Sequence, residues 1–224
     1  MITEKNCGAV ILAGGRSSRM GRNKALITIN GGTLLAHLSH ALSRFDEKLL
    51  STNDPLMAAG YPLHPVADKY PNSGPMGGLH ASLLATRKQA LLCVPCDLPN
   101  FNAQAADVLL THFSSGADAL VCVDSQGRTH PLCGIYSRST ISLFEQFLVN
   151  GNYRMHAALQ KMNCIFLQTA DLFSDQVFFC FVLPLFFIAG QRVIMRVQQA
   201  MRIFAVGLSQ IFVIKHFDRL VVMR

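Results

Sequence analysis

A basic, glycine-rich segment near the start of the chain carries the residue types that bind phosphate. It reads Leu-Ala-Gly-Gly-Arg-Ser-Ser-Arg-Met-Gly-Arg-Asn-Lys over residues 12–24. Glycine lets backbone N–H groups approach an anion closely, and Arg19 and Lys24 add positive charge. An apolar run over residues 7–13 overlaps its start and predicts a buried strand. A nucleotide phosphate would therefore lie at the carboxyl end of this strand, where α/β sheets bind their ligands.

The spacing of the glycines separates this segment from the two common phosphate motifs. Its glycines are Gly14, Gly15 and Gly21. A P-loop requires four residues between its glycines and then Gly-Lys-Ser/Thr, and the dinucleotide fingerprint requires Gly-x-Gly-x-x-Gly. The alternative interpretation is a solvated turn that happens to be basic, which three glycines, Arg and Lys at these offsets disfavour.

Asp97 is the strongest candidate for a metal ligand. It follows an apolar run over residues 90–94, and Pro95 and Pro99 force the chain to turn there. Mg²⁺ takes few protein carboxylates and fills its shell with phosphate oxygens and water, so one aspartate is sufficient. A helix cap is the structural alternative for Asp97.

Two further polar residues follow predicted strands in the same half of the chain. Asn53 comes after a strand over residues 48–52, and Asp68 comes after residues 65–67. Asp68 could hold ribose hydroxyls, assist the metal or cap a turn. Asn53 could read a base or ribose, although Asn-Asp-Pro is also an ordinary turn.

The chemistry these residues suit is nucleotidyl transfer. Charge develops on the leaving pyrophosphate, and the fixed cations Arg19 and Lys24 would stabilise it together with a metal at Asp97. No protein nucleophile is needed when the acceptor is itself a phosphate. His37, His40 and His80 are expected to be surface or packing residues. For His130 an acceptor-facing position and a structural role are about equally favoured.

The elements that must position these residues alternate between strands and helices. This alternation predicts an α/β fold with a doubly wound, mostly parallel sheet. A turn over residues 124–128 and a returning strand over 130–136 predict an antiparallel hairpin. A second glycine-rich segment, residues 72–78, opens a helix with Leu79, Leu83 and Leu84 on one face. The remaining helices are expected over residues 34–45, 105–113, 141–148 and 153–161, and the remaining strands over 119–123 and 164–167.

Charge is distributed unevenly over the 224 residues. The chain has 20 Lys/Arg and 13 Asp/Glu, a net charge of +7, of which residues 1–175 account for +2 and residues 176–224 for +5. The nearly neutral body lacks the basic face of a nucleic-acid-binding protein. The N-terminus is polar and carries an acidic residue, which is unlike a signal peptide.

The seven cysteines indicate reduced thiols in a cytoplasmic protein. Their number is odd and most lie in apolar runs. The Cys93-Val-Pro-Cys96 pair has no second ligand pair for zinc, and it follows a strand instead of opening a helix. Buried structural thiols are therefore predicted.

The amino-acid composition changes near residue 176, which predicts two parts. These are a nucleotidyltransferase domain over residues 1–175 and an atypical apolar, basic C-terminal extension over residues 176–224. The apolar run over residues 177–189 contains Pro184 and falls short of the roughly 20 residues that span a bilayer.

With these pieces assembled, the chain resembles the molybdenum cofactor guanylyltransferases, in the molybdopterin branch of the nucleotidyltransferase superfamily. The likeness runs from about residue 7 to about residue 168. The segments that carry it are residues 12–24, 30–31, Asn53, Asp68, 74–78, 96–99 and 130–131.

The resemblance implies transfer of GMP from GTP to the molybdopterin-bound cofactor, with release of pyrophosphate and Mg²⁺ at Asp97. Its partners would be GTP, the molybdenum cofactor and other proteins of cofactor synthesis or use, with no nucleic acid. The nucleotide contacts it implies are Leu12, Ala13, Gly14, Lys24, Asn53, Asp68 and Asp97.

The C-terminal part departs from the family, which usually closes on a Phe-x-Asn-x-Asn-Thr-Pro segment. A shifted reading frame, a membrane-surface anchor and a divergent core segment are three hypotheses for it. The alternatives for the activity are cytidylyl transfer, transfer to a sugar phosphate, and a non-catalytic nucleotide or cofactor carrier.

Overall fold

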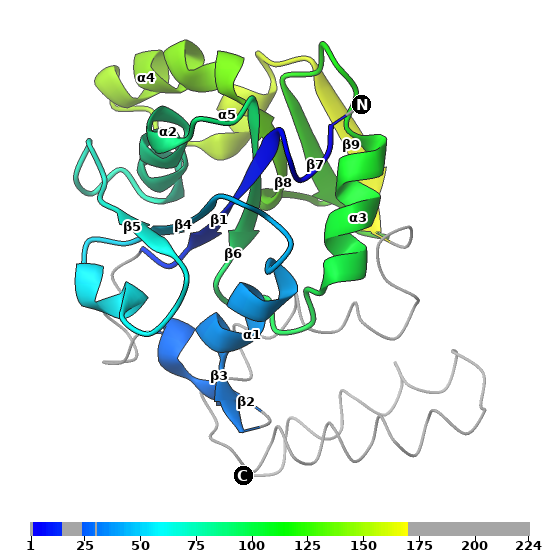
Figure 1. The fold of residues 1–224 in the computed structure, drawn as a ribbon. Helices are drawn as coiled ribbons and strands as arrows, with labels where there is room; N and C mark the ends of the chain where they lie inside the picture. The colour runs from blue at the N-terminus through cyan, green and yellow to red at the C-terminus, as the bar shows by residue number, and fades with distance from the viewer. Residues whose placement is uncertain (1, 15–23, 30, 170–224) are drawn as a thin grey trace, which may run out of the picture. The chain divides into compact units, whose positions relative to one another are not determined.

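The computed structural model describes residues 2–14, 24–29 and 31–169. In this part of the chain the centre is a seven-stranded sheet with the order β5-β4-β1-β6-β8-β7-β9 (Figure 1). A separate two-stranded ribbon pairs β2 with β3. The strands are β1 Cys7–Leu12, β2 Thr28–Ile29, β3 Gly32–Thr33, β4 Lys48–Ser51, β5 His64–Val66, β6 Ala90–Pro95, β7 Ala119–Val123, β8 Thr129–Ser137 and β9 Cys164–Gln168.

The strand directions bring most of the candidate residues to one edge of the sheet. β1 runs parallel to β4 and β6, β4 runs parallel to β5, and β7 runs parallel to β9. β8 is antiparallel to both β6 and β7. The carboxyl ends of all these strands except β8 therefore share one edge, and β8 begins there. The predicted mostly parallel sheet with an antiparallel hairpin is confirmed.

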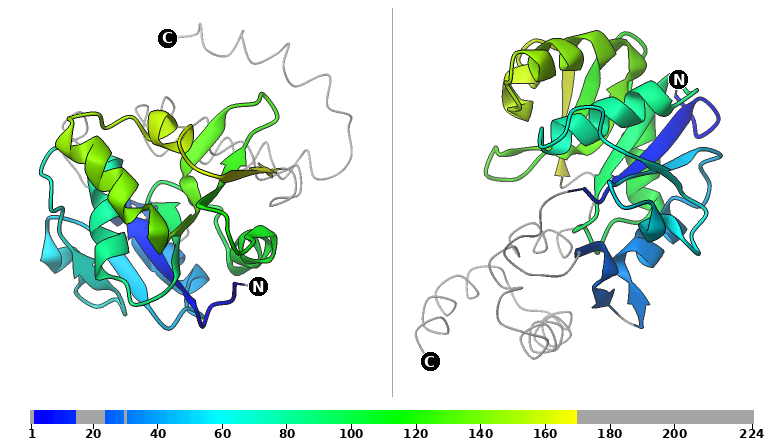
Figure 2. Two further views of the ribbon diagram at one scale, coloured as in Figure 1. Left: turned by 90° about the horizontal axis from the view of Figure 1, so that it is seen from above. Right: turned by 90° about the vertical axis from the view of Figure 1, so that its left-hand side faces the viewer.

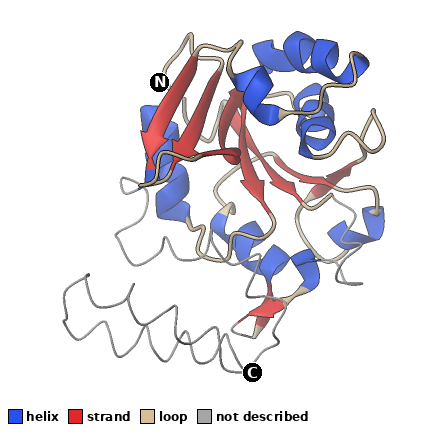
Figure 3. Cartoon of the chain, turned by 180° about the vertical axis from the view of Figure 1, so that it is seen from behind, coloured by secondary structure: helices blue, strands red, loops and turns tan. Residues whose placement is uncertain are grey.

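Helices cover both faces of the sheet (Figures 1, 2 and 3). α2, α4 and α5 pack on one face, and their apolar residues form one cluster with residues of β1, β6 and β7. α1 and α3 lie on the other face. The predicted doubly wound arrangement is thus confirmed. The helices are α1 Leu34–Ala41, α2 Pro75–Ala85, α3 Ala103–His112, α4 Ile141–Val149 and α5 Met155–Leu159, with 3₁₀ turns η1 Lys24–Leu26, η2 Pro55–Ala58 and η3 Arg138–Thr140.

Local chemistry explains where the elements begin. β1 is buried at every position, as expected for a parallel strand covered on both faces. Thr33 caps α1, because its Oγ1 accepts a hydrogen bond from the Ala36 N–H at 3.0 Å. Asn102 caps α3 in the same way through the Ala105 N–H at 2.9 Å.

The structure corrects several expectations about the elements. Leu79 and Leu83 are fully buried but Leu84 is 41% exposed, so the three do not share one environment as their predicted common face implies. Every residue from Met76 to Leu83 is buried, because α2 lies between the sheet and α4. The helix predicted over residues 153–161 is limited to α5, and the β2–β3 ribbon was not predicted. The predicted division at residues 175/176 lies outside the described residues.

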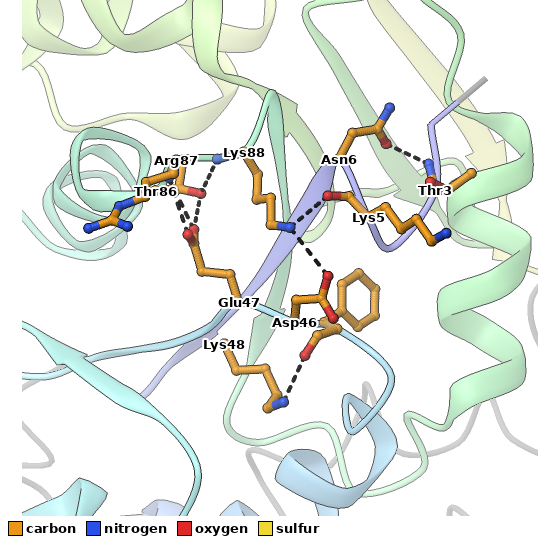
Figure 4. A network of polar contacts seen from close by, with 10 residues as sticks. Thr3, Lys5, Asn6, Asp46, Glu47, Lys48, Thr86, Arg87 and Lys88 are labelled. Atoms are coloured by element: carbon orange, nitrogen blue, oxygen red, sulfur yellow. Dashed lines mark hydrogen bonds and ion pairs between the residues drawn. The ribbon is translucent and has the colours of Figure 1, made fainter.

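The opposite, amino-terminal edge of the sheet is closed by polar groups that bind one another (Figure 4). Lys88 Nζ donates to the Lys5 carbonyl at 2.6 Å and lies 3.5 Å from the Asp46 carboxylate. Glu47 accepts hydrogen bonds from the Thr86 hydroxyl and from the Arg87 N–H. These charges tie segments of the fold together at the edge away from the candidate site.

Candidate functional site

The carboxyl end of β1 is fixed between its two neighbours. The Ala13 N–H donates to the Ser51 carbonyl at 3.0 Å, and the Cys96 N–H donates to the Leu12 carbonyl at 3.0 Å. Leu12 and Ala13 are buried, whereas Gly14 is exposed. The predicted phosphate-binding segment therefore starts at an accessible backbone position between the ends of β4 and β6.

Two predicted cationic residues are not placed by this geometry. Arg19 lies outside the described residues. Lys24 is the first residue of η1, and only its backbone is described. The roles assigned to both side chains remain predictions.

Asn53 and Asp68 lie against each other, as their positions after adjacent strands required. The Asp68 N–H donates to Asn53 Oδ1 at 3.0 Å, and Asn53 Nδ2 donates to Asp68 Oδ2 at 3.4 Å. Partial burial raises the pKa of Asp68, and the hydrogen bond from Asn53 opposes this effect. The pair joins the ends of β4 and β5 into one polar surface, which suits recognition of hydroxyl or amide groups.

The amino end of α2 lies close to the Asn53–Asp68 pair. Gly74 has φ +65° and precedes Pro75 at the first helical position. A Cβ added at Gly78 would overlap Ser51 Oγ and lie 3.4 Å from Asp68 Oδ1. The second glycine-rich segment is therefore required for close packing of α2 against β4, a role that its spacing did not reveal.

Asp97 follows β6 and is exposed at the same edge. The part of the chain that the structure describes holds no group of three or more His, Cys, Asp or Glu side chains that could bind a metal. Mg²⁺ needs only one or two carboxylates when phosphate and water complete its shell. An exposed carboxylate beside the end of β1 fits that requirement.

A charged cluster that was missed in the sequence lies at the turn between β7 and β8. Asp124 is 2% exposed, and its Oδ2 accepts from Arg128 Nε at 2.8 Å and contacts His130 Nε2 at 3.2 Å. The sequence predicts only a turn over residues 124–128, and it does not indicate that Asp124 contacts Arg128 or His130. The Asp-x-x-x-Arg-x-His spacing across a predicted turn is the signal that could have found the cluster.

The ionisation of Asp124 follows from its partners. Burial alone would raise the pKa of this carboxyl group. The N–H groups of Arg128 and Gln126, the Arg128 guanidinium and His130 outweigh burial and lower the pKa of Asp124 to about 2. Asp124 is therefore an anion at neutral pH and can only accept hydrogen bonds.

The described cysteines and histidines agree with structural roles. Of the Cys93–Cys96 pair predicted to be buried, Cys93 is fully buried and burial raises the pKa of its thiol, whereas Cys96 is only partly buried. His37 Nε2 contacts the Phe101 carbonyl at 3.0 Å, and His40 is exposed. His80 is completely buried, as a packing residue.

The fold and the residues gathered at its carboxyl edge define an α/β protein of the nucleotidyltransferase type. The crystal structure of molybdopterin-guanine dinucleotide biosynthesis protein A from Archaeoglobus fulgidus superposes with a TM-score of 0.62 and 21% identity, covering 74% of this chain and 85% of that one. A likeness at this identity shows the fold.

The family is shown by the comparison of sequences over most of the chain. The model of the MobA-like NTP transferase domain matches residues 9–165, and the chain belongs to this family. A protein of Peptoclostridium acidaminophilum named "Probable molybdenum cofactor guanylyltransferase" is 31% identical over 165 residues, covering 71% of this chain and 75% of its own length. The molybdenum cofactor guanylyltransferase of Syntrophotalea carbinolica is 30% identical over 156 residues, covering 69% of this chain and 74% of its own.

Among the described residues no helix has the length and apolar character needed to cross a membrane.

Proposed function

We propose that this protein transfers GMP from GTP to the molybdenum cofactor and so forms the guanine dinucleotide cofactor. The observation that carries the proposal is the meeting of four strand ends at one edge, with Gly14, Asn53, Asp68 and Asp97 each two residues past a strand end. The names of the relatives supply the choice of guanine and of the acceptor.

In the proposed reaction an oxygen of the acceptor phosphate attacks the α-phosphorus of GTP. The bond from that phosphorus to the bridging oxygen breaks, and pyrophosphate leaves. The backbone of Leu12, Ala13 and Gly14 would hold the triphosphate. Arg19 and Lys24 would stabilise the charge that develops on the leaving group.

The remaining predicted contacts orient the nucleotide. Asn53 and Asp68, already paired, would present amide and carboxylate groups to the ribose and base. Mg²⁺ held by Asp97 would neutralise charge on the phosphates. Positioning and electrostatics supply the rate, so the proposal assigns no covalent intermediate.

The test is guanylylation of molybdopterin-bound molybdenum by the wild type and by Asp97→Ala. We expect a loss of at least about 100-fold in the variant, because a metal ligand and its charge are removed. Asp46→Ala is the matched control, since its side chain is 70% exposed at the opposite edge. Near-normal activity of Asp97→Ala would contradict the assignment.

Nucleotide and product measurements separate the alternatives. Titrations with GTP, CTP and UTP should give the tightest binding for GTP, and tighter binding of CTP or UTP would overturn the choice of nucleotide. A carrier would bind GTP and the cofactor without releasing pyrophosphate. The enzyme should release one pyrophosphate for each GMP transferred.

A further inference from the structure

At the carboxyl edge of the sheet, the neighbouring strands β6 and β8 are no longer paired with each other. Pairing between β6 and β8 runs from Ala90–Ser137 to Cys93–Gly134 and stops there. Beyond this point the last residues of β6 pair with β1, and His130 near the start of β8 pairs with Cys122 of β7. The strand order reverses direction between β1 and β6, where α/β sheets bind their ligands, and the gap between β6 and β8 is the next position along the same edge. Apart from Lys24, the predicted nucleotide residues lie at or just after the carboxyl ends of β1, β4, β5 and β6, on one side of this position.

The cluster of Asp124, Arg128 and His130 borders the other side. Two strand spacings separate β6 from β7, which is about 10 Å. Asp124 follows the carboxyl end of β7, and Arg128 directly precedes β8. The cluster therefore lies at the edge that carries Asp97, but outside the strands assigned to GTP.

Hydrogen bonds within the cluster hold the Arg128 guanidinium in a position in which it can bind an anion. The Arg128 backbone is fixed to Asp124 in both directions, N–H to Oδ1 at 2.9 Å and carbonyl to the Asp124 N–H at 2.9 Å. Its Nε is held by Oδ2 at 2.8 Å. The terminal nitrogens carry the remaining N–H donors, and the side chain is 58% exposed although its carboxylate partner is buried.

The role of His130 follows from the charge of Asp124. An ionised carboxylate only accepts, so His130 Nε2 carries the hydrogen in the 3.2 Å contact. Arg128 and His130 thus share Oδ2, and Asp124 fixes the direction of both. A guanidinium held in place before a ligand arrives loses less freedom on binding, and its planar donors match a phosphate group.

We propose that Arg128 binds the phosphate group of the acceptor, and that Asp124 is a positioning residue which holds Arg128 for this purpose. The inference rests on the proposed function, because that function makes the acceptor a phosphate. It adds an acceptor contact on the β7–β8 turn to the GTP contacts on the other half of the sheet.

Two variants distinguish a role in binding the acceptor from a role in stabilising the β7–β8 turn. Arg128→Gln removes the guanidinium. Asp124→Asn keeps the Oδ1 that accepts from the Gln126 and Arg128 N–H groups, and so keeps the turn, but it replaces the Oδ2 acceptor by an NH₂ donor. The double variant tests whether Asp124 acts through Arg128. Arg44→Gln is the control, because Arg44 is similarly exposed at 53% and pairs with Glu4 and Asp107 at the opposite edge.

Each variant is assayed for the KM of the acceptor, the KM of GTP and kcat. We expect Arg128→Gln to raise the acceptor KM by about tenfold to a hundredfold, with the GTP KM changed less than about twofold. Asp124→Asn should raise the acceptor KM in the same direction, and the double variant should be no worse than Arg128→Gln. Arg44→Gln should match the wild type.

Three outcomes would contradict the proposal. A rise in the GTP KM equal to that for the acceptor would place Arg128 on the triphosphate. An unchanged acceptor KM in Arg128→Gln would leave the cluster a turn-stabilising device. Full additivity in the double variant would show that Asp124 does not act through Arg128. Acceptor affinity without nucleotide, followed by pterin fluorescence, tests Arg128 even if the wild type transfers no GMP, so the failure of one proposal is distinct from the failure of the other.

Discussion

At Gly78 the first turn of α2 approaches β4 so closely that a side chain has no room. The added Cβ would overlap Ser51 Oγ. We expect Gly78→Ala to move α2 away from β4, to lower the free energy of unfolding by about 1–3 kcal/mol and to weaken GTP binding. Chemical denaturation and calorimetric titration with GTP measure the two effects.

A second substitution identifies the cause. In Gly78→Ala the Ser51 Cβ would lie 3.4 Å from the new methyl group, so Ser51→Ala removes the overlap without creating another. The double variant should recover most of the lost stability. Gly32→Ala is the control, because nothing lies within 4 Å of a Cβ there. An additive double variant would show that overlap with Ser51 is not the cause.

His80 is a buried polar side chain whose ring nitrogens have no hydrogen-bond partner in the described part of the chain. Tyr70 lies beside it with ring centroids 5.6 Å apart, and the charges of Glu145 and Lys69 act on it. Burial lowers the pKa of His80 below its ordinary value of 6.5. The unfolded chain therefore binds more protons than the folded chain below this pH. Stability should fall as the pH drops through about 6.5 and below, by at most about 1.4 kcal/mol per pH unit.

Replacing His80 tests whether its protonation causes the loss of stability at low pH. We expect His80→Leu to raise the free energy of unfolding by about 1 kcal/mol at pH 7, because it removes an unpartnered buried group at similar volume. It should also flatten the decline in stability between pH 6.5 and 5, measured by denaturation at each pH. The exposed His40→Gln should keep the wild-type decline. A destabilised His80→Leu with an unchanged slope would contradict the account.

At the scale of elements, β8 is the strand that joins the two halves of the sheet, and Gly134 decides whether it fits. A Cβ at Gly134 would overlap the Leu120 carbonyl of β7, which is backbone and cannot turn aside. We expect Gly134→Ala to lower the free energy of unfolding by at least about 3 kcal/mol. Thermal and chemical denaturation measure the loss.

Another strand glycine in the same sheet provides the comparison. A Cβ at Gly8 would meet the end of the flexible Leu91 side chain at 2.9 Å. Gly8→Ala should therefore cost only about 1 kcal/mol. Equal losses in the two variants would mean that the contact with backbone is not what makes Gly134 necessary.

The helices and strands also show which features of the fold sequence patterns can predict. Apolar runs predicted β1, β6 and β7 because strands covered on both faces need continuous burial. The same patterns placed Asn53, Asp68 and Asp97 directly after strands, and therefore at one edge. Patterns in one segment carry no information on which strands become neighbours, so the insertion of β8 between β6 and β7 was not foreseen.

The contacts that the sequence did not predict also depend on which elements become neighbours in the fold. Asp124, Arg128 and His130 come together through a turn whose side-chain directions depend on the β7–β8 pairing. His80 lies on α2, which packs against α4, an element from a distant part of the sequence. Spacing within α2 alone could not predict the burial of His80, and for the same reason it did not separate the exposed Leu84 from the two buried leucines of its predicted face.

For the whole molecule, the prediction that residues 1–175 form the nucleotidyltransferase domain can be tested by truncation. The strands of the seven-stranded sheet end at Gln168, and the predicted nucleotide and metal residues lie between Leu12 and Asp97. We therefore expect a chain that ends at residue 175 to unfold in one cooperative transition and to bind GTP within about threefold of the full chain. Calorimetry measures both properties. A truncated chain that unfolds without cooperativity, or no longer binds GTP, would show that residues 176–224 complete the core or the site.

The same pair of chains tests the membrane-surface hypothesis for residues 176–224, which carry a net charge of +5 with long apolar runs. Apolar burial and attraction to anionic lipid act together in such segments. Under that hypothesis the full chain should sediment with phosphatidylserine vesicles in low salt, and the truncated chain should remain in solution. Because the electrostatic part is screened, binding of the full chain should weaken between about 0.05 and 0.5 M salt. Equal sedimentation of the two chains would exclude the hypothesis and leave a divergent core segment or a shifted reading frame.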